Sequence, residues 1–177
     1  DLFVTNLDNE SNTFYLNTGK GLFEDRTSEF GLFRLGLTGF GTRFFDYDND
    51  GWLDLMVVNG AVRHLPAQVR AGDPYPLKQR SQLLRNESGR RFVDVTVAAG
   101  PVFDRLEVAR GLSVGDLDND GDSDAVIFTN SGPARVLRND VGSRQHWLGL
   151  RVLDRGRDAV QARVALIRRT GVPLMRR

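Results

Sequence analysis

The stretch FFDYDNDGWLDLMVVNG, residues Phe44–Gly60, joins an acidic loop directly to an apolar strand. Three aspartates stand at alternate positions, a glycine follows the third, and a fourth aspartate comes three residues after the glycine. The same arrangement returns as VGDLDNDGDSDAVIFTN, residues Val114–Asn130. Four carboxylates held this close repel one another and raise one another's pKa unless a cation lies among them. The repeated pattern therefore predicts a repeated cation-binding loop between two strands.

Calcium is the cation that these loops suit best, because Ca²⁺ takes six to eight hard oxygen ligands in a flexible arrangement. Gly51 and Gly121 permit the sharp bend that brings alternate carboxylates together. Mg²⁺ fits less well, since it demands a strict octahedron and usually retains waters. The alternative is a pair of solvated turns that hold no metal. The predicted ligands are Asp46, Asp48, Asp50, the Trp52 carbonyl and Asp54 in the first loop, and Asp116, Asp118, Asp120, the Asp122 carbonyl and Asp124 in the second.

An EF-hand or dockerin-type loop begins in a similar way. An EF-hand needs a bidentate acid at position twelve and a helix on each side of the loop. Position twelve is Val57 in the first loop and Ile127 in the second, and both lie in predicted strands. The nine-residue loop is therefore expected between two strands of a sheet.

A repeat of tens of residues runs through the chain, which changes the fold assignment. TFYLNTGKGLFEDRTSEFGL from Thr13 matches SQLLRNESGRRFVDVTVAAG from Ser81, and PARVLRNDVGSRQHWLGLRV from Pro133 begins the pattern a third time. DLFVTN at Asp1 aligns with DLMVVN at Asp54. Asp1 is thus expected to be the last aspartate of another such loop, in a chain cut from something longer.

Short segments rich in Val, Phe and Leu, separated by Gly, Asn and Asp, predict strands rather than helices. Four antiparallel strands in each repeat of about 50 to 70 residues are typical of a β-propeller blade. The strands predicted for the middle repeat are Gly39–Phe45, Leu53–Asn59, Gln82–Arg85 and Phe92–Thr96. The predicted divisions are a partial blade at 1–36, a blade at 37–107 with an inserted loop at 60–80, a blade at 108–143, and a separate C-terminal part at 144–177.

The amino-acid composition excludes some classes of site and of partner. Hydrophobic residues make up 40% of the 177 residues, enough for a core, and the absence of Cys excludes disulfides and thiolate metal sites. Residues 144–177 carry nine Arg and two Asp, a net charge of +7, so residues 1–143 carry −6 of the overall +1. Two divalent cations would bring that acidic region close to neutral. The Arg residues are spread among apolar positions, which favours a solvated face over a nucleic-acid site.

The loops and their preceding strands, GFGTRFFDYDNDGWLDLMVVNG and RGLSVGDLDNDGDSDAVIFTNSG, resemble the FG-GAP repeats of integrin α-subunit propellers, called VCBS-type repeats in bacteria. RAGDPYPLKQRSQLLRNESGRRFVDVT and RQHWLGLRVLDRGRDAVQARV are similar to the cartilage acidic protein family, whose members end in an ASPIC/UnbV domain. The resemblance implies a calcium-binding propeller of about seven blades and the start of an ASPIC/UnbV domain near Gln145. Gln161 departs from the glycine usual in that family. The preference for Arg over Lys, 22 to two, adds the expectation of a bacterial source.

The function expected from these features is a non-catalytic, calcium-stabilised module for adhesion or protein interaction. Sites with dissociation constants of about 10⁻⁴ to 10⁻³ M stay empty at cytosolic calcium, which favours an extracellular, periplasmic or cell-surface location. No nucleic-acid partner and no direct membrane insertion are expected.

Two other functions remain open. A glycan-binding propeller would use Trp52, Tyr75 and Trp147 as stacking platforms, although Trp147 is expected in the core of an alternating strand. An extracellular enzyme would have His64, near Asp73 and Tyr75, as its candidate general base, with His146 in a structural role.

Overall fold

The structure is a computed structural model. It describes the chain except residues 34–35, 131, 146, 148–149 and 159–177. The chain divides into two compact units, Asp1–Gln145 and His146–Arg177.

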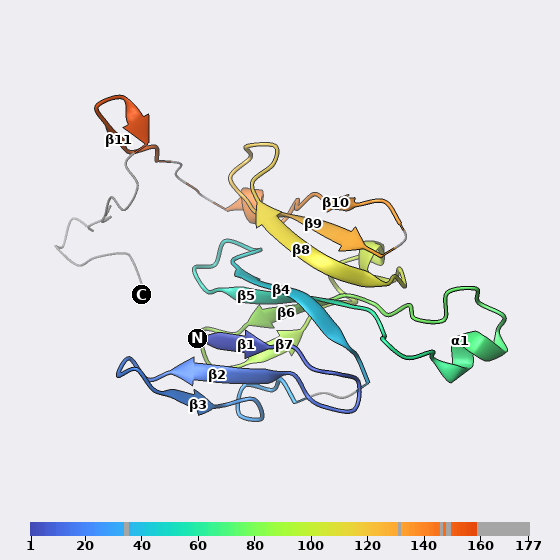
Figure 1. The fold of residues 1–177 in the computed structure, drawn as a ribbon. Coiled ribbons are helices and arrows are strands. Elements are labelled where there is room, and N and C mark those ends of the chain that lie inside the picture. The colour runs from blue at the N-terminus through green and yellow to red at the C-terminus, as the bar shows by residue number, and fades with distance from the viewer. Residues whose placement is uncertain (34–35, 131, 146, 148–149, 159–177) are drawn as a thin grey trace. The chain divides into compact units, whose positions relative to one another are not determined.

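Antiparallel sheets make up the first unit (Figure 1), which confirms the predicted all-β class. The first sheet has the order β1 (Leu2–Val4), β2 (Thr13–Asn17), β3 (Phe23–Asp25). The second sheet has the order β4 (Gly39–Phe45), β5 (Asp54–Asn59), β6 (Gln82–Asn86), β7 (Phe92–Asp94). The third sheet has the order β10 (Arg135–Leu137), β9 (Asp124–Thr129), β8 (Ala109–Gly115). Each strand therefore lies beside its neighbour in sequence, as in a meander.

Two 3₁₀ helices flank the third sheet. The 3₁₀ helix η1 (Pro101–Phe103) precedes the third sheet, and η2 (Gly142–Arg144) follows it. In the second unit, the described residues form a hairpin of β11 (Leu153–Asp154) and β12 (Arg157–Asp158).

The strands predicted for the middle repeat all form, and their bounds differ from the prediction by one or two residues at most. The largest difference is in β7, which ends at Asp94 instead of Thr96. The Asp94 carboxylate accepts the N–H of Thr96 at 3.0 Å, and the Thr96 hydroxyl accepts the N–H of Leu83 at 3.0 Å. Beyond Asp94, the Val95 N–H still donates to the Leu83 carbonyl at 3.0 Å, and the side-chain oxygens of Asp94 and Thr96 complete the hydrogen bonds at the end of the strand.

The inserted loop at 60–80 contains one element that the sequence analysis did not predict, the helix α1 (Pro66–Arg70). Pro66 favours a helix start because its φ is preset and its missing N–H is not needed there. The Gln68 side chain accepts the N–H of Lys78 at 3.0 Å and donates to the Lys78 carbonyl at 2.6 Å, which closes the loop on itself. None of the residues of α1 is buried, so the sequence has no apolar stripe that would have predicted this helix.

The same strand offset recurs in all three sheets. Each sheet has an asparagine at or just beyond the end of one strand: Asn17 of β2, Asn86 of β6 and Asn139 after β10. The residue after the last loop aspartate pairs with the residue two positions before this asparagine: Leu2 with Tyr15, Leu55 with Leu84, and Ala125 with Leu137. This register is the structural form of the sequence repeat.

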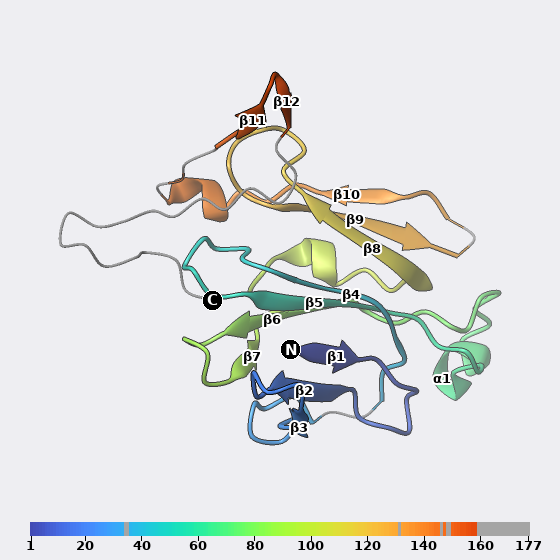
Figure 2. The same cartoon turned by 60° about the vertical axis from the view of Figure 1, so that its left-hand side comes forward.

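The sheets are stacked in chain order, with β5 buried throughout between its neighbours (Figures 1 and 2). Leu55 and Val57 pack in one apolar cluster with Phe14 of the first sheet. Met56 and Val58 pack in a second cluster with residues of the third sheet. A strand with both faces buried reads as a continuous apolar run, which explains the sequence that follows the acidic loop.

Strands β4 and β8 approach each other closely at Gly41. A Cβ atom there would lie 2.7 Å from the Leu112 nitrogen and 3.0 Å from the Gly111 carbonyl carbon. We expect Gly41→Ala to lower the free energy of unfolding by about 1–3 kcal/mol, because backbone atoms have no room to yield. Urea denaturation measures this change.

Gly115→Ala is the matched control, since a Cβ at Gly115 meets nothing within 4 Å. It should change stability by no more than about 0.5 kcal/mol. Equal stabilities for the two variants would contradict the close approach of the sheets.

Candidate metal centre

The first acidic loop connects β4 to β5 and folds around its own carboxylates. Asn49 has φ of 53° and Gly51 has φ of 90°, so two left-handed residues turn the backbone sharply. Asp46 accepts the N–H of Asp50 at 3.0 Å through one oxygen and that of Gly51 at 2.8 Å through the other. Carboxylate oxygens of Asp46, Asp48 and Asp50 all lie within 4.8 Å of one another. The structure thus brings together the first three predicted ligands.

The second acidic loop, between β8 and β9, repeats this geometry. Asn119 has φ of 60° and Gly121 has φ of 90°. Asp116 accepts the N–H groups of Asp120 at 3.2 Å and of Gly121 at 3.1 Å. Oxygens of Asp116, Asp118 and Asp120 lie within 4.8 Å of one another. The two loops therefore form the same three-carboxylate cluster with the same internal hydrogen bonds.

The donors in the first cluster fit a hard cation. The Oδ1 atom of Asp48 is buried and has no hydrogen-bond partner. Burial and the neighbouring carboxylates of Asp50 and Asp46 raise the pKa of Asp48. A buried carboxylate oxygen without a partner is costly, and a cation among the three acids would remove that cost.

In the second cluster, the pKa of Asp118 is raised. The largest cause is desolvation, and the charges of Asp120 and Asp124 add to it. Asp118 is nevertheless exposed, whereas Asp48 is half-buried. The two clusters thus share their geometry but differ in how far they are covered.

The fourth aspartate of each loop lies outside these clusters and is buried. Asp54 accepts the N–H of Tyr47 at 3.0 Å and that of Asn86 at 2.7 Å. Asp124 accepts the N–H of Leu117 at 2.8 Å and that of Asn139 at 2.8 Å. Their role as closing ligands stays a prediction. The hydrogen bonds show a second role, which is to tie the start of each loop to an asparagine at or just beyond the end of the second strand after the loop.

The two residues predicted to give carbonyl ligands use their side chains in different ways. Trp52 packs against the turn between β6 and β7, where a Cβ atom at Gly89 would lie 2.4 Å from its ring. Asp122 is 2% exposed, and its Oδ2 accepts the N–H of Ser143 at 2.8 Å. Burial is the main cause that raises the pKa of Asp122, and its Oδ1 has no partner. Whether either carbonyl binds metal stays a prediction.

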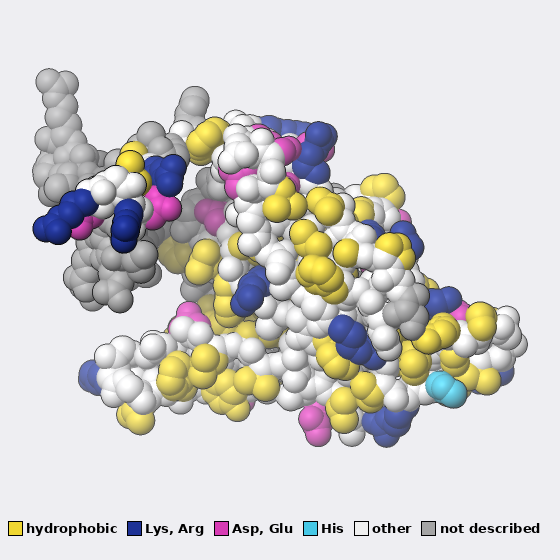
Figure 3. Space-filling view, turned by 45° about the horizontal axis from the view of Figure 1, so that its top comes forward, with side chains coloured by type: hydrophobic (Ala, Val, Ile, Leu, Met, Phe, Trp, Pro, Cys, Tyr) yellow, Lys and Arg dark blue, Asp and Glu magenta, His cyan; other side chains and the backbone are white. Residues whose placement is uncertain are grey.

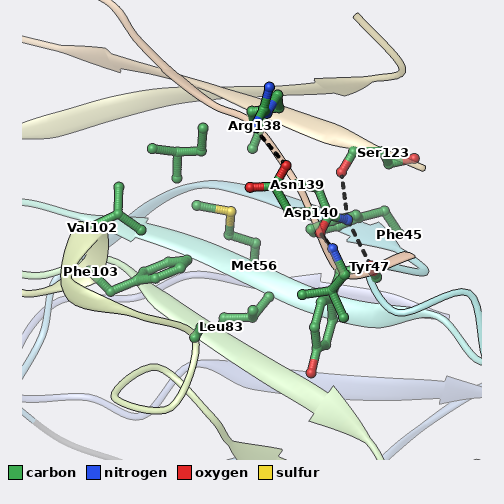
Figure 4. Close-up of a pocket in the computed structure, with 14 residues that line it drawn as sticks. Phe45, Tyr47, Met56, Leu83, Val102, Phe103, Ser123, Arg138, Asn139 and Asp140 are labelled. Carbon is green, nitrogen blue, oxygen red and sulfur yellow. Dashed lines mark hydrogen bonds and ion pairs between the residues drawn. The ribbon is translucent and has the colours of Figure 1, made fainter. Parts of the chain in front are cut away.

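Two asparagine side chains, to which the sequence analysis gave no role, join the second sheet to the third. Asn49 donates to the carbonyls of Gly121 at 3.2 Å and Gly142 at 3.0 Å. Asn139 donates to the carbonyls of Tyr47 at 2.7 Å and Ser123 at 3.3 Å (Figure 4). In the sequence, Asn recurs at the same position of both acidic loops and at the same position of each turn. This recurrence was the only sequence feature that indicated these two side chains.

A cavity of about 210 Å³ lies beside the Asn139 bridge, between the second and third sheets (Figure 4). Its walls are largely apolar and include Met56, Leu83, Phe103 and Leu137. The apolar packing between the sheets is therefore incomplete here, and the asparagine bridges supply polar contacts across the same join.

The remaining predicted residues lie apart from the clusters. His64 is exposed, ahead of α1. Asp73 binds Lys78 at 2.9 Å, and this hydrogen bond is the main cause that lowers its pKa. Tyr75 is 44% exposed. Trp147 is 51% exposed and outside any strand, so the prediction that it is a core residue was wrong.

His146 and Gln161, like most of the proposed ASPIC/UnbV segment, lie outside the described residues. On the face drawn in Figure 3, Lys and Arg side chains are scattered among acidic and hydrophobic ones.

Comparison with protein families agrees with the loop geometry. Residues 1–57 match the FG-GAP-like repeat. The match spans the first sheet, β4, the first acidic loop and most of β5. The predicted FG-GAP resemblance is thus confirmed for this part of the chain, while the ASPIC/UnbV assignment and the bacterial source stay predictions. A search of curated proteins finds no match. Within the described residues, no helix has the length and apolar character to cross a membrane.

The buried Asp54 predicts a pH dependence of the metal-free protein. Burial raises its pKa from the ordinary 3.8 to about 7, although the hydrogen bonds from Asn86 and Tyr47 oppose the shift. Between these values the folded state holds a proton that the unfolded state has released, so stability should fall as pH rises from about 4 to about 7. Melting temperatures of calcium-depleted protein across this range measure the slope.

Asp54→Asn should make this slope shallower, because it removes the carboxyl group whose pKa is raised to about 7. Asp48, Asp118 and Asp122, whose pKa values are also raised, should keep part of the slope. Asp104→Asn is the control, since Asp104 is exposed and lies outside both loops. A melting temperature that rises steadily from pH 4 to pH 7 in the calcium-depleted wild type would contradict the raised pKa of Asp54.

Proposed function

We propose that this chain is part of a non-catalytic, calcium-binding β-propeller of a secreted or cell-surface protein that mediates adhesion or protein interaction. The observation that carries the proposal is the duplication of the three-carboxylate cluster at the same place in two successive sheets. The FG-GAP-like match over residues 1–57 supports the propeller.

Calcium is favoured by the chemistry of the donors. Each cluster offers carboxylate oxygens, which are hard ligands suited to Ca²⁺. The predicted carbonyl and closing aspartate of each loop would raise the number of oxygen donors toward the six to eight that calcium takes. Tight octahedral demands make Mg²⁺ a poorer fit for carboxylates spread along a nine-residue loop.

The bound ion would stabilise the loop that holds it. At millimolar calcium, a site with a dissociation constant of about 10⁻⁴ to 10⁻³ M gains about 0.4–1.4 kcal/mol of stability. Gains of this size stiffen the loop ends of the sheets without deciding whether the chain folds. Calcium reaches millimolar concentrations outside cells, so such sites suit a secreted or surface protein.

Propellers suit adhesion because stacked sheets form a rigid body whose connecting loops present a binding face. A glycan is the second candidate ligand. A groove of about 270 Å³ is lined by Tyr75, Lys78 and Arg105, among others. The half-exposed ring of Tyr75 offers a stacking surface, and the two basic side chains offer hydrogen-bond donors for sugar hydroxyls or carboxylates.

Isothermal titration calorimetry with calcium tests the metal sites. The full chain should bind about two ions, one for each cluster. Asp50→Ala and Asp120→Ala should each remove one of them. Asp104→Ala, an exposed substitution outside both loops, should leave the stoichiometry unchanged. A folded protein that gives no calcium-dependent heat would overturn the proposal.

Removal of calcium should also lower the melting temperature. Two sites of the expected affinity contribute about 1–3 kcal/mol in total, which corresponds to a shift of several degrees for a chain of this size. Differential scanning calorimetry in calcium and in chelator measures the shift. The double variant Asp50→Ala/Asp120→Ala should melt at one temperature in both solutions, and an undiminished shift in that variant would place the stabilising ions elsewhere.

A further inference from the structure

The last residues of the first unit form a short turn, Gly142–Gln145, which we name the boundary turn. It consists of η2 (Gly142–Arg144) and Gln145, and the second unit begins at the next residue. Inside the turn, the N–H of Arg144 donates to Val141 at 3.3 Å and that of Gln145 donates to Gly142 at 3.0 Å. The boundary turn follows β10, the last strand of the third sheet, and side chains of both acidic loops contact it.

Gly142 is wedged between the two acidic loops. A Cβ atom there would lie 2.7 Å from the Asp122 Cβ, 2.9 Å from the Tyr47 carbonyl oxygen and 3.0 Å from the Asn49 amide nitrogen. The Gly142 carbonyl accepts a hydrogen bond from that amide at 3.0 Å. Only glycine leaves room for both loops to contact the turn at this point.

Ser143 supplies the second attachment. Its N–H donates to the Oδ2 of Asp122 at 2.8 Å, and Asp122 is almost fully buried. A hydrogen bond to a buried carboxylate is stronger than one between neutral groups. The boundary turn is thus held by one side chain from each acidic loop.

Both residues lie among the predicted metal ligands, and the Asp122 carbonyl is one of them. Asn49 stands between Asp48 and Asp50, and Asp122 comes two residues after Asp120. The Asn49 amide also donates to the Gly121 carbonyl of the second loop at 3.2 Å. One carboxamide therefore connects the first loop, the second loop and the boundary turn.

We propose that calcium in the acidic loops holds the boundary turn in place, so that calcium controls how firmly the end of the first unit is fixed. This inference rests on the calcium sites proposed above. The physical reason lies in the clusters, whose carboxylate oxygens lie within 4.8 Å of one another. An ion draws them together and fixes the backbone at Asn49. Without the ion their repulsion loosens the loop and weakens both hydrogen bonds of the Asn49 amide.

Hydrogen exchange of the full chain, followed by mass spectrometry of peptides that contain the boundary turn, tests the proposal. The amides of Ser143, Arg144 and Gln145 are all hydrogen-bonded and report whether the turn is closed. Exchange should be about fivefold slower in millimolar calcium than after calcium removal, the change expected for gaining one net hydrogen bond. Calorimetry on the same sample counts the bound ions.

Asn49→Gly is the decisive variant. Glycine accepts the positive φ of residue 49 without strain, so the loop keeps its shape and its three carboxylates but loses the bridging amide. It should still bind about two ions, while the boundary turn exchanges in calcium as fast as in the calcium-free wild type. Asn119→Gly is the matched control at the same loop position, with an exposed side chain, and should leave exchange of the turn unchanged.

Asp50→Ala tests the same link between calcium and the boundary turn by removing a predicted metal ligand. It retains the Asn49 amide but removes a carboxylate of the first cluster, so one ion should be lost and the turn should exchange fast even in calcium. Agreement of this variant with Asn49→Gly would support the proposal.

A failure of this inference can be told apart from a failure of the proposed calcium-binding function. Two bound ions with identical exchange in calcium and chelator would overturn the inference and leave the calcium-binding function intact. Slow exchange in Asn49→Gly, or equally fast exchange in Asn119→Gly, would likewise overturn it. Absence of any calcium heat in the folded wild type would overturn both proposals together.

Discussion

The buried carboxylate that closes each acidic loop is the interaction on which the rest of the fold depends. Asp54 and Asp124 lie in the interior, where an unpartnered carboxylate would be strongly unfavourable. Each accepts the N–H of the loop's second residue and the N–H of an asparagine at or just beyond the end of the next paired strand. Asp1 accepts the N–H of Asn17 in the same way. These bonds fix the offset between the two strands that they join.

This offset determines which face of each strand packs against which neighbouring sheet. In β5, Leu55 and Val57 face the first sheet, while Met56 and Val58 face the third. A slip of one residue would exchange these faces and move every side chain of the strand to the other core. The stacking of the sheets, and with it the adjacency of their acidic loops, therefore depends on where the buried carboxylate finds its donors.

Two loops with one sequence pattern nevertheless differ in their surroundings. Asp48 is half-buried and Asp118 is exposed, and the first loop contacts the second loop and the boundary turn through Asn49. Among the described residues of the first unit, no further sheet covers the second loop in the same way. Two sites with the same local geometry can thus differ in electrostatic environment, and any difference in their affinities would come from the neighbouring sheet.

The sequence by itself determined the all-β class, the strands of the middle repeat and the positions of the two carboxylate clusters. These features are local: alternate aspartates and a glycine at positive φ shape the loop, and apolar runs between turn residues define the strands. The tertiary structure alone decided the partners of Asn49, the burial of the Asp122 side chain and the exposure of Trp147. Asn49 and Gly142 are 93 residues apart, and no local period encodes a contact at that separation, which arises because the register of each sheet fixes how the next one stacks.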